Sequence, residues 1–284
     1  MTADLPPIAT TALPDGERVP VLGQGTWKMG EDARRRDAEI AALRHGLDLG
    51  MTLIDTAEMY ANGMSEVIVG EAIAGRRDEV FLVSKVLPSH ASRFGTIRAC
   101  EGSLRRLDTD VIDLYLLHWA GDEPLAETIE AFGRLQDEGK IRHWGVSNFD
   151  PGDCEALFAL AGGDAAAANQ VLYNPGRRGI EFDLLPWCQR RGLPVMAYSP
   201  IEQGRIARHP ALAAVAQRHG ATPAQIALAF VLRQPGVIAI PKAGSSAHVA
   251  ENRAACALAL DDADMAVLDR AFPPPARASA LQML

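Results

Sequence analysis

The chain has 284 residues, of which 48% are hydrophobic and 23% charged, and its formal net charge is −8. This composition is typical of a folded globular protein. The acidic balance excludes an ordinary nucleic-acid binder, which needs a basic surface to displace the counterions of the phosphates. The cysteines form neither a CxxC pair nor a Cys/His cluster at metal-ligand spacing, so we expect reduced thiols and no metal site. They are Cys100, Cys154, Cys188 and Cys256.

The first ten residues, MTADLPPIAT, have neither the basic region nor the apolar region of a secretory signal. The longest apolar run, around IALAFVL, is much shorter than the ~18 residues that a membrane-spanning helix requires. We therefore expect a cytoplasmic protein that binds no membrane and acts as a monomer.

The expected elements begin with a PDGE turn signal between apolar flanks, which predicts a β-hairpin within residues 1–20 that plugs one end of the fold. Short apolar runs then recur, each followed by a stretch with helical spacing. They are PVLGQG near residue 21, MTLID near 52, VFLVSK near 81, VIDLYLLH near 112, IRHWGVS near 142, AANQVLY near 168, LPVMAYS near 194 and VIAIPK near 238. Their starts lie about 26 to 32 residues apart, except for a last interval of about 44, which holds two helical segments.

The helical segments have recognisable ends. Residues 38–50 and 125–140 close at Gly50 and Gly139, as helices often do. Thr222 as N-cap with Pro223 behind it marks a helix start in the long interval. The residues from 261 onward predict one extra helix followed by a proline-rich tail, residues 273–284, that folds over the mouth of the protein.

The alternation of strands and helices predicts a (β/α)8 barrel with an N-terminal hairpin and an extra C-terminal helix, in a single domain of residues 1–284. The continuously apolar runs suit parallel strands that are covered on both faces. The alternative, a doubly wound open sheet, needs fewer strands or a second domain.

In such a barrel the active site lies at the C-terminal ends of the strands, so the polar residues that close each run are the candidates. In chain order they are Asp55 with Tyr60, Lys85, His118, Ser147 with Asn148, Gln170, Tyr198 with Ser199, and Lys242. Each one alone has an ordinary interpretation, such as a helix cap, a solvated lysine or a packed aromatic residue. Four of them, at the ends of three consecutive strands, favour a common site.

Asp55, Tyr60, Lys85 and His118 together suit proton donation to a carbonyl oxygen. An adjacent Lys85 ammonium should lower the pKa of the Tyr60 hydroxyl, while Asp55 holds the lysine charged. His118 then orients the carbonyl by a hydrogen bond.

The motifs GQGTWKMG, LIDTAEMY, LVSKV, DLYLLHW, GKIRHWGVSNF, NQVLYNP, VMAYSP and IPKA with HVAENRA resemble, in order and spacing, those of the aldo-keto reductases from about residue 15 to 272. The resemblance is greatest to bacterial members that reduce ketoaldehydes such as methylglyoxal. It implies a catalytic tetrad of Asp55, Tyr60, Lys85 and His118, with Tyr60 as general acid. It also implies a substrate pocket formed by Trp27, Tyr60, His118 and Trp119.

The resemblance further implies a bound NADPH. Ser147, Asn148 and Gln170 would hold the nicotinamide carboxamide, and Tyr198 would stack on the ring. The pyrophosphate would pass Ser199 and Ile201, and Lys242 and the HVAEN segment, read as a turn, would meet the adenosine end, with Glu251 and Asn252 on the adenine. The full set of implied cofactor residues is Thr26, Trp27, Asp55, Ser147, Asn148, Gln170, Tyr198, Ser199, Ile201, Lys242, Ala243, Ser245, His248, Glu251 and Asn252.

Two departures from the family pattern concern the choice of cofactor. His248 stands where NADPH-using members commonly have an arginine for the 2′-phosphate, and Ala243 replaces a serine. NADPH is still favoured, because Lys242 offers a charge to that phosphate, but NADH stays possible. GQGTWK is no Rossmann fingerprint, since it has only the first two of the three glycines.

The sequence thus predicts an NADPH-dependent reductase of small aldehydes, ketoaldehydes or diketo sugars. One alternative is a nicotinamide-binding redox sensor or regulatory subunit with slow turnover. Another is a Schiff-base aldolase that uses Lys85, although such enzymes usually place the lysine on the sixth strand, which here offers Asn169, Gln170 and Asn174. The role of Glu58, between Asp55 and Tyr60, stays open.

Overall fold

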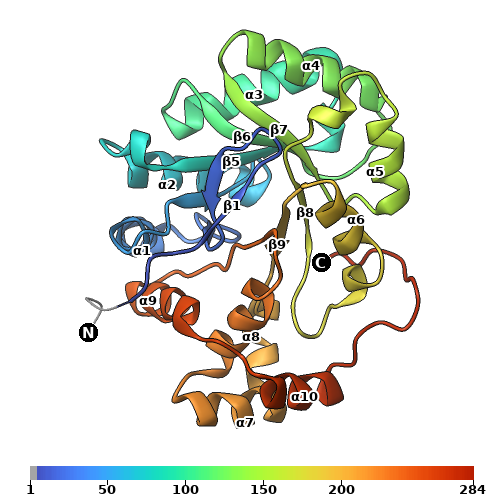
Figure 1. The fold of residues 1–284 in the computed structure, drawn as a ribbon. Helices are drawn as coiled ribbons and strands as arrows, with labels where there is room; N and C mark the ends of the chain where they lie inside the picture. Colours follow the sequence, from blue (N-terminus) through green and yellow to red (C-terminus); the bar gives the residue numbers. More distant parts are fainter. Residues whose placement is uncertain (1–4) are drawn as a thin grey trace.

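The computed structural model describes residues 5–284 and shows eight parallel strands in one sheet, surrounded by helices (Figure 1). The barrel strands are β3 (Gln24–Gly25), β4 (Leu53–Asp55), β5 (Phe81–Val86), β6 (Ile112–Leu117), β7 (Ile141–Ser147), β8 (Asn169–Leu172), β9 (Val195–Tyr198) and β10 (Val237–Ala239). Neighbours in the sheet follow the order of the chain. Parallel bridges from Leu22 to Ala239 and from Gly25 to Lys242 then join the first strand to the last. The predicted (β/α)8 barrel is confirmed, and the open doubly wound sheet is wrong.

The helices lie on the outside of the barrel. They are α1 (Arg36–Asp48), α2 (Met64–Ile73), α3 (Arg93–Leu107), α4 (Leu125–Asp137), α5 (Pro151–Phe158), α6 (Leu184–Arg190), α7 (Pro210–His219), α8 (Pro223–Leu232), α9 (Ser246–Ala254) and α10 (Asp262–Ala271). The predicted caps are present: Gly50 and Gly139 have φ values of 83° and 70°, and Thr222 forms a capping box with Gln225. No helix within residues 5–284 is long and apolar enough to cross a membrane.

The first barrel strand is much shorter than its apolar run suggested. Only Gln24 and Gly25 pair as a strand, with Ile54 and Asp55 of β4. A Cβ atom on Gly25 would lie 2.6 Å from the backbone oxygen of Ile240, so closure of the barrel here depends on a residue without a side chain.

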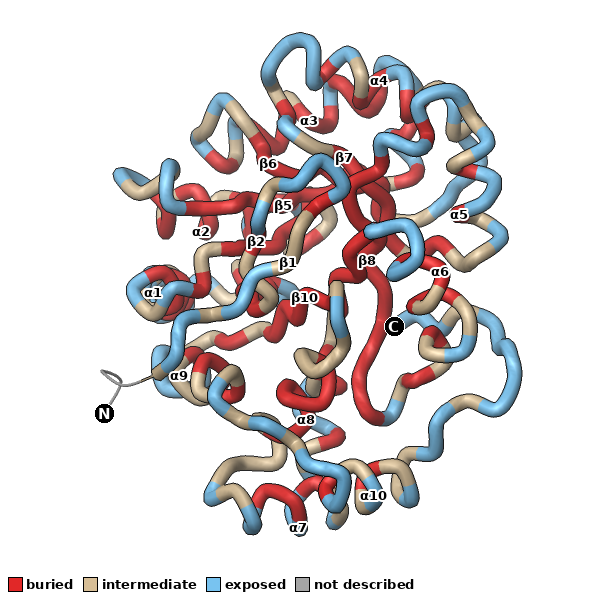
Figure 2. The backbone as a smooth tube through the Cα atoms, in the orientation of Figure 1, coloured by how far each residue is buried: buried red, intermediate tan, exposed pale blue. Residues whose placement is uncertain are grey.

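Two apolar cores follow from the two faces of the strands, and Figure 2 shows the buried backbone concentrated on the strands and on the inner sides of the helices. The larger core fills the space between strands and helices. The smaller one fills the barrel interior with Leu53, Val83, Leu114 and Met196, among others. All four cysteines are free, as expected.

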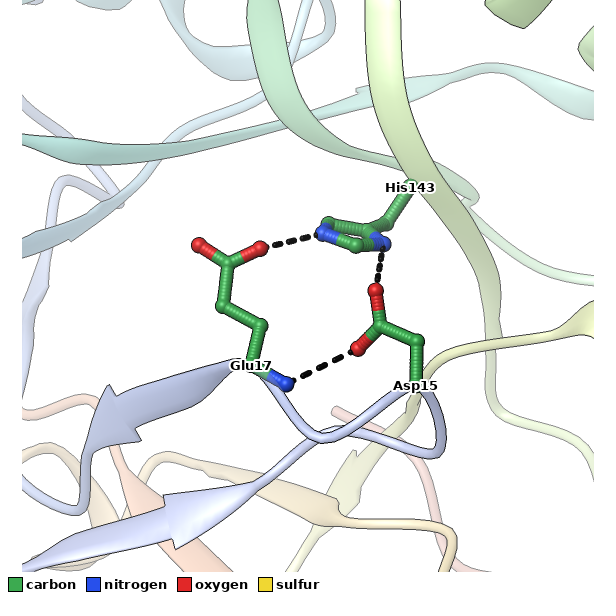
Figure 3. A group of neighbouring side chains, drawn as sticks. All are labelled: Asp15, Glu17 and His143. Atoms are coloured by element: carbon green, nitrogen blue, oxygen red, sulfur yellow. Dashed lines mark hydrogen bonds and ion pairs between the residues drawn. The ribbon is translucent and has the colours of Figure 1, made fainter.

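The predicted hairpin is present as β1 (Thr10–Ala12) and β2 (Arg18–Pro20), which pair antiparallel. Its Leu13 and Val19 are buried in the interior core, so it plugs the end of the barrel where the strands begin. Polar contacts also hold it in place: His143 at the start of β7 lies 2.6 Å from Glu17 and 3.6 Å from Asp15 (Figure 3).

The tail after α10 returns across the molecule towards β8 and α6 (Figure 1). Arg178 donates hydrogen bonds to the backbone oxygen of Phe272 and to Asp269, and Arg177 contacts Gln282. These contacts direct the last residues, Met283 and Leu284, to the cavity at the other end of the barrel.

Candidate active site

Four side chains meet where the strands end. Asp55 closes β4, Lys85 is the penultimate residue of β5, and His118 directly follows β6. Tyr60 opens a short 3-10 helix after β4. Their exposed fractions are 3%, 0%, 7% and 8% for Asp55, Lys85, His118 and Tyr60, and all but Lys85 line a cavity.

Lys85 is the centre of the group. Its Nζ atom lies 2.8 Å from Asp55 Oδ2, 2.8 Å from the Thr56 carbonyl oxygen and 3.2 Å from the Tyr60 hydroxyl. An ammonium group has three hydrogens, and each has an acceptor here. Burial alone would lower the pKa of Lys85, but the charges and hydrogen bonds of Asp55 and Tyr60 outweigh it, so that the pKa is raised. Lys85 is therefore a permanent cation.

The Tyr60 hydroxyl differs from expectation in its acidity. Burial raises its pKa, and the Asp55 charge adds to this, while the Lys85 ammonium opposes both. The expected lowering of the pKa is wrong. Burial destabilises the phenolate more than the neighbouring Lys85 ammonium stabilises it, because this ammonium is already paired with Asp55. The hydroxyl is therefore fully protonated at neutral pH.

His118 is held neutral. Burial, and next the charge of Lys85, lower its pKa to about 3. Its Nδ1 atom is buried without a hydrogen-bond partner within the described residues. Because an unpaired acceptor costs less there than an unpaired N–H, we assign the proton to Nε2. The ring can then donate a hydrogen bond to a substrate oxygen.

An aromatic wall surrounds these groups. The Trp27 and Tyr60 rings pack edge to face with centroids 4.9 Å apart, and the His118 and Trp119 rings lie 4.8 Å apart. Both tryptophans line a cavity of about 560 Å³, as do Tyr60, His118 and the two last residues of the chain. The polar atoms of this wall are the Tyr60 hydroxyl, the His118 imidazole and the two indole N–H groups, and the rest is apolar, which suits a small molecule with few polar groups.

The opposite wall carries the residues expected at the nicotinamide, and all of them line the same cavity. Gln170 Nε2, however, donates to Asp55 Oδ1 at 2.7 Å, so this amide holds Asp55 from across the barrel. Ser147 donates to the backbone oxygen of Gln170, and Asn148 accepts from the Tyr198 hydroxyl at 3.0 Å. Burial raises the pKa of Tyr198 to about 12, against a hydrogen bond from the backbone of Leu284 that lowers it.

The remaining expected cofactor residues divide into two sets. Thr26, Trp27, Asp55, Ser199, Ile201, Lys242 and His248 also line the cavity. Ala243, Ser245, Glu251 and Asn252 are not among its lining residues. Ser245 instead caps α9, and Glu251 accepts a hydrogen bond from Thr222. The HVAEN segment, read as a turn, lies within helix α9, since a serine N-cap precedes it and no glycine or proline interrupts it. The contacts of Glu251 and Asn252 with an adenine stay predictions.

Glu58, whose role the sequence left open, has a defined place. Its carboxylate accepts the Leu87 backbone N–H at 2.8 Å and lies 2.9 Å from His90 Nδ1, while its own N–H points to the Lys85 carbonyl oxygen at 3.5 Å. It thus brackets residues 85–87, the segment that carries Lys85. The LIDTAEMY motif draws attention to Glu58, but no spacing rule indicates Leu87 as its partner, because Leu87 lies after the next strand, β5.

Comparisons with known proteins agree with this geometry. The profile of the aldo/keto reductase family matches residues 21–272. Methylglyoxal reductase YeaE of Escherichia coli is 53% identical over 271 residues, which cover 94% of this chain and 95% of that protein. Glyoxal reductase of Bacillus subtilis is 33% identical over 92% of this chain and 91% of its own.

Solved structures give the same result. An aldo/keto reductase from Klebsiella pneumoniae, in complex with NADP and acetate, superposes with a TM-score of 0.95 at 54% identity, covering 97% of this chain and 99% of its own. The thermostable aldo-keto reductase Tm1743 superposes with a TM-score of 0.87 at 40% identity, covering 93% and 99%. On the family match, the close relatives and the shared barrel, this chain belongs to the aldo/keto reductase family.

Proposed function

We propose that this protein reduces short aldehydes and ketoaldehydes of the methylglyoxal type to alcohols, with NADPH as the hydride donor and Tyr60 as the proton donor. One observation carries the proposal: the Tyr60 hydroxyl, 3.2 Å from the Lys85 ammonium, lines a cavity beside the neutral His118. The name of the E. coli relative, methylglyoxal reductase, supports this substrate class. The small, largely aromatic pocket around Tyr60 and Trp119 agrees with it.

The residues of the cavity fit a nicotinamide dinucleotide. Tyr198 presents an aromatic ring to the cavity, and Ser147 and Asn148 lie next to it with polar atoms. At the far end Gly244 lacks the side chain that would fill the space between two cations, Lys242 and Arg35. When bound there, NADPH supplies the hydride that reduces the carbonyl carbon.

The protein's own groups handle the oxygen. Nε2–H of His118 binds and orients the carbonyl oxygen, and the Tyr60 hydroxyl gives it a proton as negative charge develops there. The resulting phenolate lies beside the Lys85 ammonium, which Asp55 and Thr56 hold in position. The raised pKa of Tyr60 keeps the acid loaded before the reaction, and the fixed cation stabilises its anion afterwards.

The geometry disfavours a Schiff-base mechanism at Lys85. A Schiff base needs a neutral amine with a free electron pair. All three hydrogens of this ammonium are donated, and its pKa is raised. Borohydride with a carbonyl substrate should therefore leave Lys85 unmodified.

The test is Tyr60→Phe, assayed by NADPH consumption with methylglyoxal. We expect kcat to fall by roughly 10²- to 10⁴-fold, as for loss of a general acid, with the Kd for NADPH unchanged. Tyr115→Phe is the matched control, because its buried hydroxyl has no partner within the described residues and does not line the cavity. Activity above a few per cent in Tyr60→Phe would show that another group gives the proton.

The substrate class has its own test, a matrix of NADPH and NADH against methylglyoxal, glyoxal, short aldehydes and diketo sugars. We expect the highest kcat/KM for methylglyoxal and glyoxal with NADPH. Tight NADPH binding without turnover of any of these carbonyls would support a redox sensor instead.

A further inference from the structure

Arg35 and Lys242 lie close together although they are far apart in the sequence. Arg35 ends a short 3-10 helix before α1, and Lys242 follows β10. The two segments meet because β3 and β10 are bridged and α1 packs beside α9 (Figure 1). A Cβ atom on Gly244 would lie 2.6 Å from Nη2 of Arg35 and 2.9 Å from Nζ of Lys242. Two cationic groups thus face the same small space, which only a glycine leaves open.

Nearby acids compensate the two charges only in part. The pKa of Lys242 is lowered, first by burial and next by the charge of Arg35, which Glu39 and Glu31 offset only in part. Glu39, whose side chain is 2% exposed, approaches Arg35 from the other side, 3.8 Å from Nε. Its second oxygen accepts the backbone N–H of Gly30. Glu39 therefore pairs with Arg35 at Nε, while Nη2 is the guanidinium atom nearest to Gly244.

Arg35 is not among the residues that line the cavity, but at Gly244 it meets Lys242, which does line it. Two cations held together in this way form a site for an anion. Lys242 and His248 line the cavity, and Ser245 caps the N-terminus of α9 at the same place. A phosphate that replaced the missing side chain of Gly244 would contact both cations at once. Arginine suits this role because its planar fork matches phosphate oxygens in pairs.

We propose that Arg35, with Lys242, binds the 2′-phosphate of NADPH and thereby selects NADPH over NADH. The inference rests on the proposed function, since it takes NADPH as the cofactor. It explains how a chain with His248 in place of the expected arginine retains a guanidinium for this phosphate: the group comes from the segment before α1.

The test measures cofactor binding directly, by the quenching of tryptophan fluorescence, in the wild type, Arg35→Gln and Arg35→Lys. We expect Arg35→Gln to raise the Kd for NADPH by about 10- to 100-fold and to change the Kd for NADH by less than about twofold. Arg35→Lys should fall between the two, because an ammonium keeps the charge and loses the fork. The NADPH affinity of Arg35→Gln should also depend less steeply on salt.

The chain offers a matched control in Arg34→Gln. Arg34 is the neighbouring arginine on the same short helix, but its side chain is 90% exposed and pairs with Asp32. It should leave both cofactor affinities unchanged. Gly244→Ala is a second probe from the facing segment, and the added methyl group should weaken NADPH binding more than NADH binding.

Each outcome of these binding measurements supports or overturns the role of Arg35. Equal losses for NADPH and NADH in Arg35→Gln, or no loss for either, would overturn the role of Arg35. These results differ from a failure of the proposed function, which the wild type would show by lacking NADPH binding or carbonyl reduction altogether.

Discussion

The two ends of strands β5, β6 and β7 carry similar side-chain chemistry in different surroundings. Where β5 and β6 end, His118 lines a cavity, and Lys85 contacts Asp55 and Tyr60, which line it too. Where β6 and β7 begin, Asp113, Arg142 and His143 lie under the hairpin and form ion pairs with it and with each other. Both ends hold acids, cations and a histidine, but among the described residues the cavity of about 560 Å³ lies at the ends of the strands.

The partners of the two histidines explain the contrast. His143 has an acid at each ring nitrogen, Asp15 on one side and Glu17 on the other (Figure 3). Arg142 binds the same oxygen of Glu17. These groups resemble a metal-ligand set, but their atoms are already paired with one another. His118 instead has an unpartnered nitrogen and a cation next to it. The ion pairs at the hairpin end hold the hairpin against the barrel, whereas His118 at the cavity end can still form hydrogen bonds with a ligand.

The largest effect should come from Lys85→Met at the cavity end. This change leaves the Asp55 carboxylate buried without its cation, and the free energy of unfolding should fall by about 3–5 kcal/mol. Activity should be lost as well, because the Tyr60 phenolate loses its neighbour. Urea unfolding and NADPH consumption measure the two effects. The double variant Asp55→Asn, Lys85→Met should regain part of the stability and none of the activity, whereas a fully stable single variant would contradict the buried pair.

Asp113→Asn tests the hairpin end. The carboxylate accepts hydrogen bonds from Arg77, from the Leu82 N–H and from Arg142, at 2.7 to 2.8 Å. We expect a loss of about 1.5–3 kcal/mol in the free energy of unfolding, typical of hydrogen bonds to a charged group, with kcat within about twofold of the wild type. A selective loss of kcat would show that the two ends are not independent.

His118→Asn should change the pH dependence of stability. Below its ordinary pKa of 6.5 this histidine is protonated in the unfolded chain, but burial and Lys85 keep it neutral in the folded protein down to about pH 3. The unfolded state therefore binds the extra proton, and acidification through this range destabilises the folded protein by about 1.4 kcal/mol per pH unit at this site. Urea unfolding at pH 7, 6 and 5 should show a weaker pH dependence for the variant. Parallel curves would mean that His118 is charged when folded.

The sequence predicts the barrel well because its signals are local. Strand runs, the Thr222 cap and the closing glycines each need only neighbouring residues, and the polar residues at strand ends follow from the direction of the strands. The features that the sequence did not predict are contacts between residues far apart in the chain, which the closed barrel brings together. Gln170 bonds to Asp55 from 115 positions away, and Arg35 meets Gly244 only because the first and last strands are neighbours.

The prediction of a lowered pKa for Tyr60 was wrong for a related reason. A neighbouring cation can be inferred from strand ends, but the degree of burial that opposes it cannot. Trp27 packs against the Tyr60 ring from the loop after the first strand, and this contact depends on the closed barrel. The resemblance of this chain to its family indicated the four candidate residues, while their protonation states required the packed structure.

The course of the C-terminal tail has a practical consequence for handling the protein. Met283 and Leu284 line the candidate site's cavity, whereas the described N-terminal residues run along the outside, where Arg253 of α9 donates a hydrogen bond to the backbone oxygen of Pro6. An affinity tag or surface anchor joined after Leu284 would therefore start at the wall of this cavity. Immobilisation for binding assays, and fusion to a reporter, should use the N-terminal side, which leaves the cavity wall unchanged.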